Sequence, residues 1–525
     1  MKKYIFSKLS VSIIAGTMAV MSCSDLTEKP DFINPSSFYA SATELELGVN
    51  AVYDDLTMGN NDWFGHFYNR FVFECLVPYQ VGWEKGPLQY NLGNISPADD
   101  YINTYWRQCY RAIDRANGII ETAETINDPA NTAKISRIKG EALFLRAFYY
   151  YELVRYFDNP PLKTTSTQSY NDLPSNSGGM RAVLDQIYKD CNAATALLPT
   201  TYTGADAGRA TKWANLTLLM KAQIWDQNWT AAKTTAETII NTGGFQLYED
   251  FSHNFDVAHE NMGERIFEGQ ASASANSNES TNSSAHFNPE DFPSQLGGAG
   301  WSWLSATKDF RMSYDATDKR IDGTFLESYP SSRVGKTSSG EYAIVHWSPK
   351  ADYNISRFGG LVDPAADPNK PEQLIFSKAW SGKLVELDEN NARTERNVIY
   401  MRYADVLLSH SEACNESGQG DPYMGINKLR ARAGLTPLKG LSQSALRDAI
   451  VAEMMHEFAF EQVTYPELRR KSKFGSTPDY LGDYIKRYST LYSVGRTPKA
   501  KDYVLPIPLI EIQGNPNVKQ NASWQ

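Results

Sequence analysis

Residues 140–162 read GEALFLRAFYYYELVRYFDNPPL and predict a long helix at the centre of the fold. Residues 142–157 contain no glycine or proline, and leucine, alanine, glutamate and arginine favour the helix. The apolar side chains run nearly all round the helix axis, which is typical of a helix buried on most faces. The pair Pro160-Pro161 should end it, because proline lacks a backbone N–H and disfavours helix in the residue before it.

Further helices follow from apolar residues at helical spacing. They are expected at residues 42–56, 101–125, 180–198, 212–226, 230–241, 399–415, 424–432 and 446–463. The small residues Ala222, Ala232 and Ala236 occur where two of these helices would cross, which resembles a tetratricopeptide unit, although an ordinary helical hairpin has the same pattern. The predicted fold class is mostly α.

The helical pattern fades between residues 244 and 397. Residues 271–300 are rich in serine, asparagine, alanine and glycine and predict a long exposed loop. Short strands are expected at residues 341–347 and 373–376. Irregular segments of this length inside a compact protein often carry function.

The N-terminus has the features of an export signal. Three lysines precede an apolar stretch at residues 9–21, which is too short to span a bilayer, so residues 1–22 read as a signal peptide. Val-Met-Ser-Cys at positions 20–23 is similar to a lipobox, in which Cys23 becomes the lipidated first residue of the mature chain. An ordinary secretory signal with a chance cysteine is the alternative. Residues 23–40 would form the tether.

Charge excludes two classes of partner. The chain carries 51 basic and 61 acidic residues, a net charge of −10, and removal of a signal peptide with three lysines and no acids makes it −13. Nucleic-acid binding and charge-driven attachment to anionic lipid both need basic surfaces. We therefore expect neither.

Residues for catalysis or metal binding are not apparent. The seven histidines are isolated, and no H-E-x-x-H, G-x-S-x-G, Walker or G-x-G-x-x-G motif occurs. Carboxylate pairs occur by chance among 61 acids, so the sequence leaves a glycosidase open. Four scattered cysteines predict buried free thiols, with disulfides as the alternative; they are Cys75, Cys109, Cys191 and Cys414. We expect no catalytic residue, cofactor or metal.

Five motifs in order resemble the SusD/RagB family, the surface glycan-binding lipoproteins that partner TonB-dependent transporters in Gram-negative bacteria. They are the helix above, IYMRYADVLL at 399–408, INKLRARAGL at 426–435, EFAFE at 457–461 with LRR at 468–470, and VLPIP at 504–508 with the segment that follows it. This resemblance implies a mostly α, SusD-like fold in a single globular unit: a tetratricopeptide-type scaffold of stacked helical pairs with long irregular loops and a few short strands. Its parts would be a helical part at 41–243 with a ligand loop at 60–94, a ligand-facing excursion at 244–397 and a C-terminal part at 398–525.

The charged residues of these motifs are expected to be structural. Arg402 and Asp405 lie three apart on an otherwise apolar helix, and buried charges must be paired. Glu457 and Glu461 are four apart and have Arg469 or Arg470 as expected partners. The run Asp318-Lys319-Arg320 resembles a family turn and should also be structural.

The resemblance implies a cell-surface protein, lipid-anchored in the outer membrane, that captures glycan and delivers it to a SusC-like transporter without cleaving it. Two other functions stay open: a surface glycoside hydrolase, and capture of a non-sugar cargo such as peptides. Sugars stack on aromatic rings and hydrogen-bond to amides, carboxylates and arginine. Exposed aromatic residues in the loop 60–94 and after the Ser/Asn-rich stretch are therefore the candidates, with a buried core position as the alternative for each. In order they are Trp83, Trp301, Trp303 and Trp63, joined by Tyr68, Arg70, Tyr90, Asn91 and Trp347.

Overall fold

The structure is a computed structural model. It describes residues 39–57, 66–82, 85–272, 286–296, 300–332, 335–347, 375–376, 380–381, 383, 396–489 and 496–525. The predicted signal peptide, Cys23, Trp63 and Trp83 lie outside these residues. Among the described residues, no helix combines the length and the apolar character that crossing a bilayer requires.

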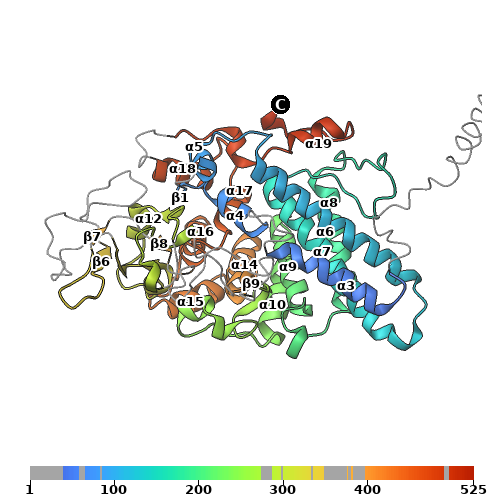
Figure 1. Cartoon of the computed structure of the whole chain (residues 1–525), viewed down its shortest axis with the longest axis horizontal. Coiled ribbons are helices and arrows are strands. Elements are labelled where there is room, and N and C mark those ends of the chain that lie inside the picture. Colours follow the sequence, from blue (N-terminus) through green and yellow to red (C-terminus); the bar gives the residue numbers. More distant parts are fainter. Residues whose placement is uncertain are drawn as a thin grey trace, which may run out of the picture.

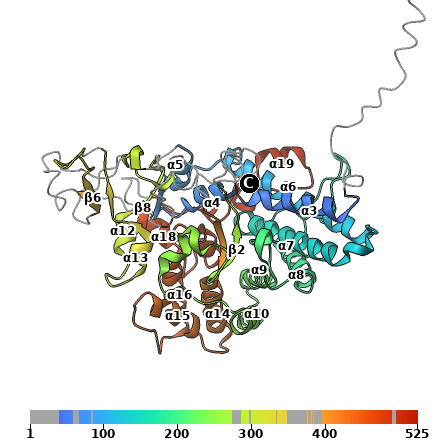
Figure 2. The ribbon, with the colours of Figure 1, turned by 60° about the horizontal axis from the view of Figure 1, so that its bottom comes forward.

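Helices stack side by side and form most of the molecule (Figure 1). The main ones are α3 (Ala42–Tyr53), α6 (Asp100–Thr125), α7 (Thr132–Phe157), α8 (Gly179–Thr195), α9 (Lys212–Trp225), α10 (Trp229–Thr242), α14 (Tyr403–Ser417), α15 (Met424–Arg432) and α16 (Gln443–Glu457). From α6 to α10 each helix packs on the next, and α14 then packs on α10. This arrangement confirms the predicted scaffold of helical pairs, and Figure 2 shows α10, α14 and α15 at its opposite edge from α3 and α6.

Helix α7 is the centre of this stack. Every residue from Gly140 to Phe157 is buried, as the apolar character all round its axis predicts. The helix ends at Phe157, and Asp158 takes the left-handed region with a φ of 62°, two residues before the proline pair. Its charged residues are paired, since the Arg146 guanidinium donates to both oxygens of Asp190 at 2.8 and 2.6 Å.

Two predicted helix boundaries were wrong. Residues 398–402 form strand β9 (Val398–Arg402), which pairs antiparallel with β2 (Arg265–Gly269), and α14 begins only at Tyr403. The carboxylate of Asp405 accepts from the Arg402 backbone N–H at 3.0 Å and so begins the helix there. Helix α16 ends at Glu457 instead of 463, and the chain then turns tightly, with positive φ at Phe460 and Gln462.

The stretch 60–94 differs from the predicted loop, because its described part contains two short helices. These are α4 (His66–Glu74) and α5 (Lys85–Leu92), with strand β1 (Gln80–Gly82) between them. Strand β1 pairs antiparallel with β3 (Leu304–Ala306) and thereby joins this stretch to the excursion.

The excursion carries short strands at one end of the molecule (Figure 1). Strand β4 (Phe325–Leu326) pairs with β8 (Trp380–Ser381), and β5 (Ser328–Pro330), β6 (Ile344–Trp347) and β7 (Ile375–Phe376) form a three-stranded sheet. The two predicted strands contain β6 and β7 and are confirmed. The remaining helices are α12 (Lys308–Met312), α13 (Arg320–Thr324), α17 (Thr464–Arg470), α18 (Tyr480–Ser489) and α19 (Leu509–Gly514).

One continuous hydrophobic core runs from α3 to the C-terminal segment. The four predicted free thiols are confirmed, since Cys75, Cys109, Cys191 and Cys414 are all buried and unpaired. Burial raises the pKa of the Cys75 thiol to about 12, which makes it unreactive at neutral pH.

Candidate ligand-binding site

An aromatic cluster gathers side chains from distant parts of the chain. It consists of Tyr68 on α4, Tyr101 on α6, and His286, Trp301 and Trp303 from the excursion. The ring centroids of Tyr68 and His286 are 4.2 Å apart, those of His286 and Trp303 4.7 Å, and those of the two tryptophans 5.0 Å. The β1–β3 pairing holds these segments together, because Trp303 directly precedes β3.

The two tryptophans and Tyr101 form the accessible part of the aromatic cluster. All three are half-buried, whereas Tyr68 and His286 are 3% and 1% exposed and lie against the tryptophans. The indole planes are inclined by 40° to each other. The cluster therefore offers a bent apolar surface on a rigid aromatic base, which suits the C–H face of a sugar ring.

The backbone between the two tryptophans is unusual. Ser302 has a φ of 53°, in the left-handed region that non-glycine residues rarely adopt. Its hydroxyl accepts from the Glu290 N–H at 2.6 Å, and its own N–H donates to the Asn288 carbonyl at 3.1 Å. At Gly300 a Cβ would lie 2.2 Å from the Pro289 carbonyl oxygen. The excursion thus holds Trp301 and Trp303 in a constrained loop, as residues of binding sites often are held.

Three predicted contact residues are structural instead, and this corrects the expectation that they face a ligand. Arg70 is 1% exposed and pairs with Glu152 at 3.3 Å. Tyr90 is fully buried, with its hydroxyl donating to Asp99 at 2.8 Å. The Asn91 amide donates to the Cys75 and Gln80 carbonyls at 2.6 and 2.9 Å. They lie on α4 and α5, and the prediction that this stretch lies outside helices led to their selection.

The other predicted residues have separate positions. Tyr68 belongs to the aromatic cluster, but it is buried beneath the tryptophans. Trp347 is half-buried on β6, where its ring contacts the Arg311 guanidinium at 4.9 Å and packs on a small group around Tyr329. His286 and Tyr101 were not predicted, because neither lies in a pattern that distinguishes it from a surface residue.

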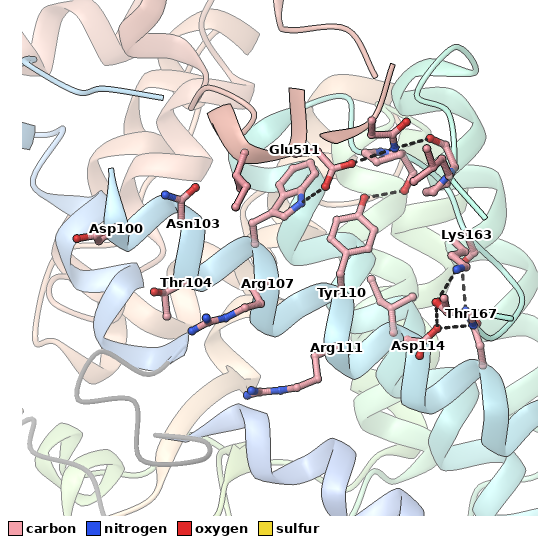
Figure 3. A pocket seen from close by; sticks show the side chains of 18 residues that line it. Asp100, Asn103, Thr104, Arg107, Tyr110, Arg111, Asp114, Lys163, Thr167 and Glu511 are labelled. Carbon is pink, nitrogen blue, oxygen red and sulfur yellow. Dashed lines mark hydrogen bonds between the residues drawn. The ribbon is translucent and has the colours of Figure 1, made fainter. Parts of the chain in front are cut away.

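A separate groove of about 670 Å³ follows α6, between residues 161–174 and α19 (Figure 3). The Tyr110 hydroxyl donates to the Pro161 carbonyl at 2.6 Å, and the Trp106 indole N–H to Glu511 at 3.4 Å. The groove is therefore shaped by contacts that attach the segment after α7 and the C-terminal segment to α6. Of the predicted ligand-binding residues that the structure describes, none lines it.

Two models of known protein families match the sequence of this chain. Residues 263–524 match the model of the SusD family, and residues 51–223 match a model described as starch-binding and associating with the outer membrane. The chain belongs to the SusD family.

Relatives of this SusD-family protein cover nearly its whole length. SusD-like protein P2 from Formosa agariphila is 27% identical over 548 residues, which cover 99% of both chains. A solved laminarin-binding SusD-like protein has a TM-score of 0.71 and 20% identity, over 92% of this chain and 100% of its own. Surface glycan-binding protein A from Bacteroides fluxus has a TM-score of 0.71 and 19% identity, over 92% and 99% of the two chains.

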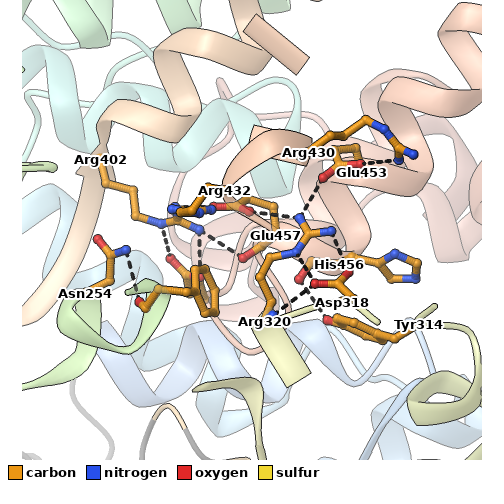
Figure 4. A network of polar contacts seen from close by, with 12 residues as sticks. Asn254, Tyr314, Asp318, Arg320, Arg402, Arg430, Arg432, Glu453, His456 and Glu457 are labelled. Atoms are coloured by element: carbon orange, nitrogen blue, oxygen red, sulfur yellow. Dashed lines mark hydrogen bonds and ion pairs between the residues drawn. The ribbon is translucent and has the colours of Figure 1, made fainter. Parts of the chain in front are cut away.

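The SusD-family motifs meet in a buried ionic network (Figure 4). Arg402 is fully buried and donates to the carboxylates of Glu264, Glu457 and Glu461 at 2.7, 2.6 and 2.7 Å. Arg320 donates to Asp318, Glu453 and Glu457 at 2.8, 2.6 and 2.9 Å. These contacts confirm the structural role predicted for the charged motifs.

The predicted partners of the two glutamates were wrong. Arg469 pairs with Asp158, and Arg470 pairs with Glu412 and Glu467. Burial opposes ionisation of Glu457, but the neighbouring guanidinium groups, Arg432 foremost, hold its pKa well below the ordinary value. A buried, ionised carboxylate is tolerated when it is paired, and Glu457 is paired with three guanidinium groups, which fits a structural role.

Proposed function

We propose that this protein is a glycan-binding lipoprotein of the outer-membrane surface. It captures an oligo- or polysaccharide and delivers it to a SusC-like TonB-dependent transporter, without cleaving the glycan. The observation that carries this proposal is the aromatic cluster, in which Trp301 and Trp303 are half-exposed on a constrained loop. Aromatic rings bind sugars by stacking, with large contact area and little loss of side-chain entropy.

The relatives support a sugar as the ligand. Two solved structures with the same fold are a laminarin-binding protein and a surface glycan-binding protein. Membership of the SusD family supports the partner transporter, and the description of the N-terminal family model supports the outer membrane. Trp83 and Trp63 remain predicted contributors to the same site.

Binding should depend on the two tryptophans. Replacing Trp301 or Trp303 with alanine should weaken the affinity for the glycan by about 30-fold, because a central aromatic contact contributes about 2 kcal/mol or more. Retardation in gels that contain each member of a polysaccharide panel measures this. Trp83→Ala tests the predicted third ring. Trp213→Ala, at a half-buried tryptophan on α9, is the matched control and should leave retardation unchanged.

Each alternative has a distinct outcome. Unchanged retardation in both Trp301→Ala and Trp303→Ala would remove the aromatic cluster as the site. No retardation on any polysaccharide would favour a non-sugar cargo. Release of reducing ends by the purified protein, abolished by a single change of one carboxylate, would establish a hydrolase.

The anchor can be tested on its own. Changing Cys23 to serine should move the protein from the membrane fraction to the soluble fraction, because no thiol remains to carry the lipid and the acidic chain is not attracted to anionic headgroups. Cell fractionation with labelled fatty acid measures both the position and the acylation. Cys75→Ser, at a buried thiol, is the control and should stay acylated. Labelling that persists in Cys23→Ser would contradict the assignment.

A further inference from the structure

Two of the seven histidines lie together with an aspartate near the start of the excursion. The donor atoms of His253, Asp256 and His259 all lie within 4.8 Å of one another. The two imidazole rings are stacked, with centroids 4.1 Å apart and planes inclined by 14°. All three residues are half-buried, so that their donor atoms are within reach of solvent.

Local backbone geometry creates this grouping. Residues 251–259 form two consecutive 3₁₀ turns, η4 (Phe251–Phe255) and η5 (Val257–His259), with Asp256 in extended conformation between them. The Asp256 carboxylate accepts from the His259 N–H at 3.0 Å and lies 2.6 Å from His259 Nδ1. The turn therefore brings His259 back towards Asp256, and η4 places His253 beside them.

The two turns are held from inside by buried charges. The Arg265 guanidinium, 0% exposed, donates to the carbonyls of His253 and Asp256 at 3.2 and 2.5 Å, and Glu268 balances its charge at 3.4 Å. At the start of η4 the ring of Phe251 lies 4.8 Å from both Lys383 Nζ and the Arg432 guanidinium. The backbone of the three donors is thus attached to the ionic network and is fixed before any ligand arrives.

We propose that His253, Asp256 and His259 bind a divalent transition-metal ion of the zinc type. Two imidazole nitrogens and one carboxylate oxygen are the donor set of many zinc sites with three protein ligands, which leave the remaining position to water. Donors about 2 Å from a metal lie about 3 to 4 Å from one another, so small side-chain rotations suffice. Calcium and magnesium prefer sites built from oxygen alone and should bind poorly. This site is separate from the aromatic cluster and independent of the proposed glycan function.

A third histidine, His410, provides the rival candidate for a zinc site. His410 lies 3.4 Å from the Cys414 sulfur and 3.7 Å from Glu237. Those residues are on α14 and α10, and the Lys233 ammonium pairs with Glu237 at 3.0 Å, which opposes a cation there. The experiment therefore includes a His410 variant.

Zinc titration of the full chain in detergent, without a polyhistidine tag, tests the proposal by competition with a chromophoric chelator. One equivalent of Zn²⁺ should bind. His253→Gln and His259→Gln should each weaken it by about 100-fold or more, since loss of even an outer-shell partner costs about 10- to 100-fold. Asp256→Asn keeps the oxygen that caps His259 and should still weaken binding, because the amide lacks the carboxylate charge. His346→Gln, at a half-buried histidine on β6, and His410→Gln should bind as the unmodified chain does.

A visible absorption band on titration with Co²⁺ gives a second readout, which should disappear in His253→Gln and His259→Gln. Absence of saturable zinc binding would overturn the proposal. So would binding that is unchanged in both variants, or binding that is lost in His410→Gln instead. Circular dichroism spectra of the His253, Asp256 and His259 variants should match that of the unmodified chain, because these three side chains are half-buried at the surface.

Discussion

Replacing Arg402 with methionine should lower the free energy of unfolding by about 3–5 kcal/mol. The methionine has a similar length, but the change removes the guanidinium that Glu264, Glu457 and Glu461 share in the buried network. Arg432, Arg320 and Lys383 still pair with these carboxylates, so the loss comes from the missing hydrogen bonds and charge of Arg402. Removing one partner from a buried ion pair costs far more than the pair contributes. Urea unfolding followed by tryptophan fluorescence measures the loss.

Arg430→Met is the matched control for this change. Arg430 is part of the same network, but its side chain is 20% exposed, and among the described residues its one ion pair is with Glu453, at 3.2 Å. Pairs near solvent contribute about 1 kcal/mol or less, so the control should stay close to the unmodified protein. Equal losses of stability in the two variants would show that burial of the carboxylates paired with Arg402 does not determine the effect.

Replacing Glu74 with glutamine should raise the stability of the variant relative to the unmodified protein as the pH increases from acidic to alkaline. Glu74 is fully buried on α4, and burial raises its pKa from 4.5 to about 7, although the Thr464 hydroxyl and the Tyr465 N–H donate to it. A carboxyl group with a raised pKa in the folded state favours folding below its unfolded pKa. That contribution is lost as the pH rises through about 7. Glutamine stays neutral at every pH, so its contribution to the free energy of unfolding does not change over this range.

The difference in unfolding free energy between Glu74→Gln and the unmodified chain should therefore shift by about 2–3 kcal/mol in favour of the variant between about pH 5 and about pH 8. Urea unfolding at the two pH values measures the shift. Glu412→Gln is the control. Burial opposes ionisation of Glu412, but Arg470 and Lys471 lower its pKa to about 2, so it is ionised at both pH values and its variant should show no shift. A pH-independent difference for Glu74→Gln would refute the raised pKa.

The helical scaffold was predictable because its signals are local. Helix α7 combines strong helix formers with apolar residues on every side, and both propensity and burial follow from that pattern. Residues 399–402 were misassigned to a helix because a strand followed at once by a helix has no break in its apolar pattern. Only the pairing of β9 with β2, more than 100 residues earlier, distinguishes the two.

The binding site was predictable only in part. Tryptophans next to a glycine-rich stretch indicated Trp301 and Trp303, and the structure brings these two together. Arg70 and Asn91 have the residue types of a sugar site, yet Arg70 neutralises Glu152 and Asn91 holds strand β1. Residue type does not distinguish a polar side chain that meets a ligand from one that meets a buried partner. The place of His286 in the site depends on its tertiary contact with Tyr68, which no sequence pattern indicates.

The pairing of β2 with β9 has a consequence for how proteins of this architecture diversify. Strand β2 ends at Gly269 and β9 begins at Val398, and these two residues are partners in the ribbon. The two ends of the polypeptide between them therefore lie at one point of the helical body. Insertions or deletions in its loops leave both ends anchored where they were. Strand β3, which pairs with β1, and Arg320, which pairs with Glu453 and Glu457, also connect this module to the body, so variation should concentrate in the loops between such contacts.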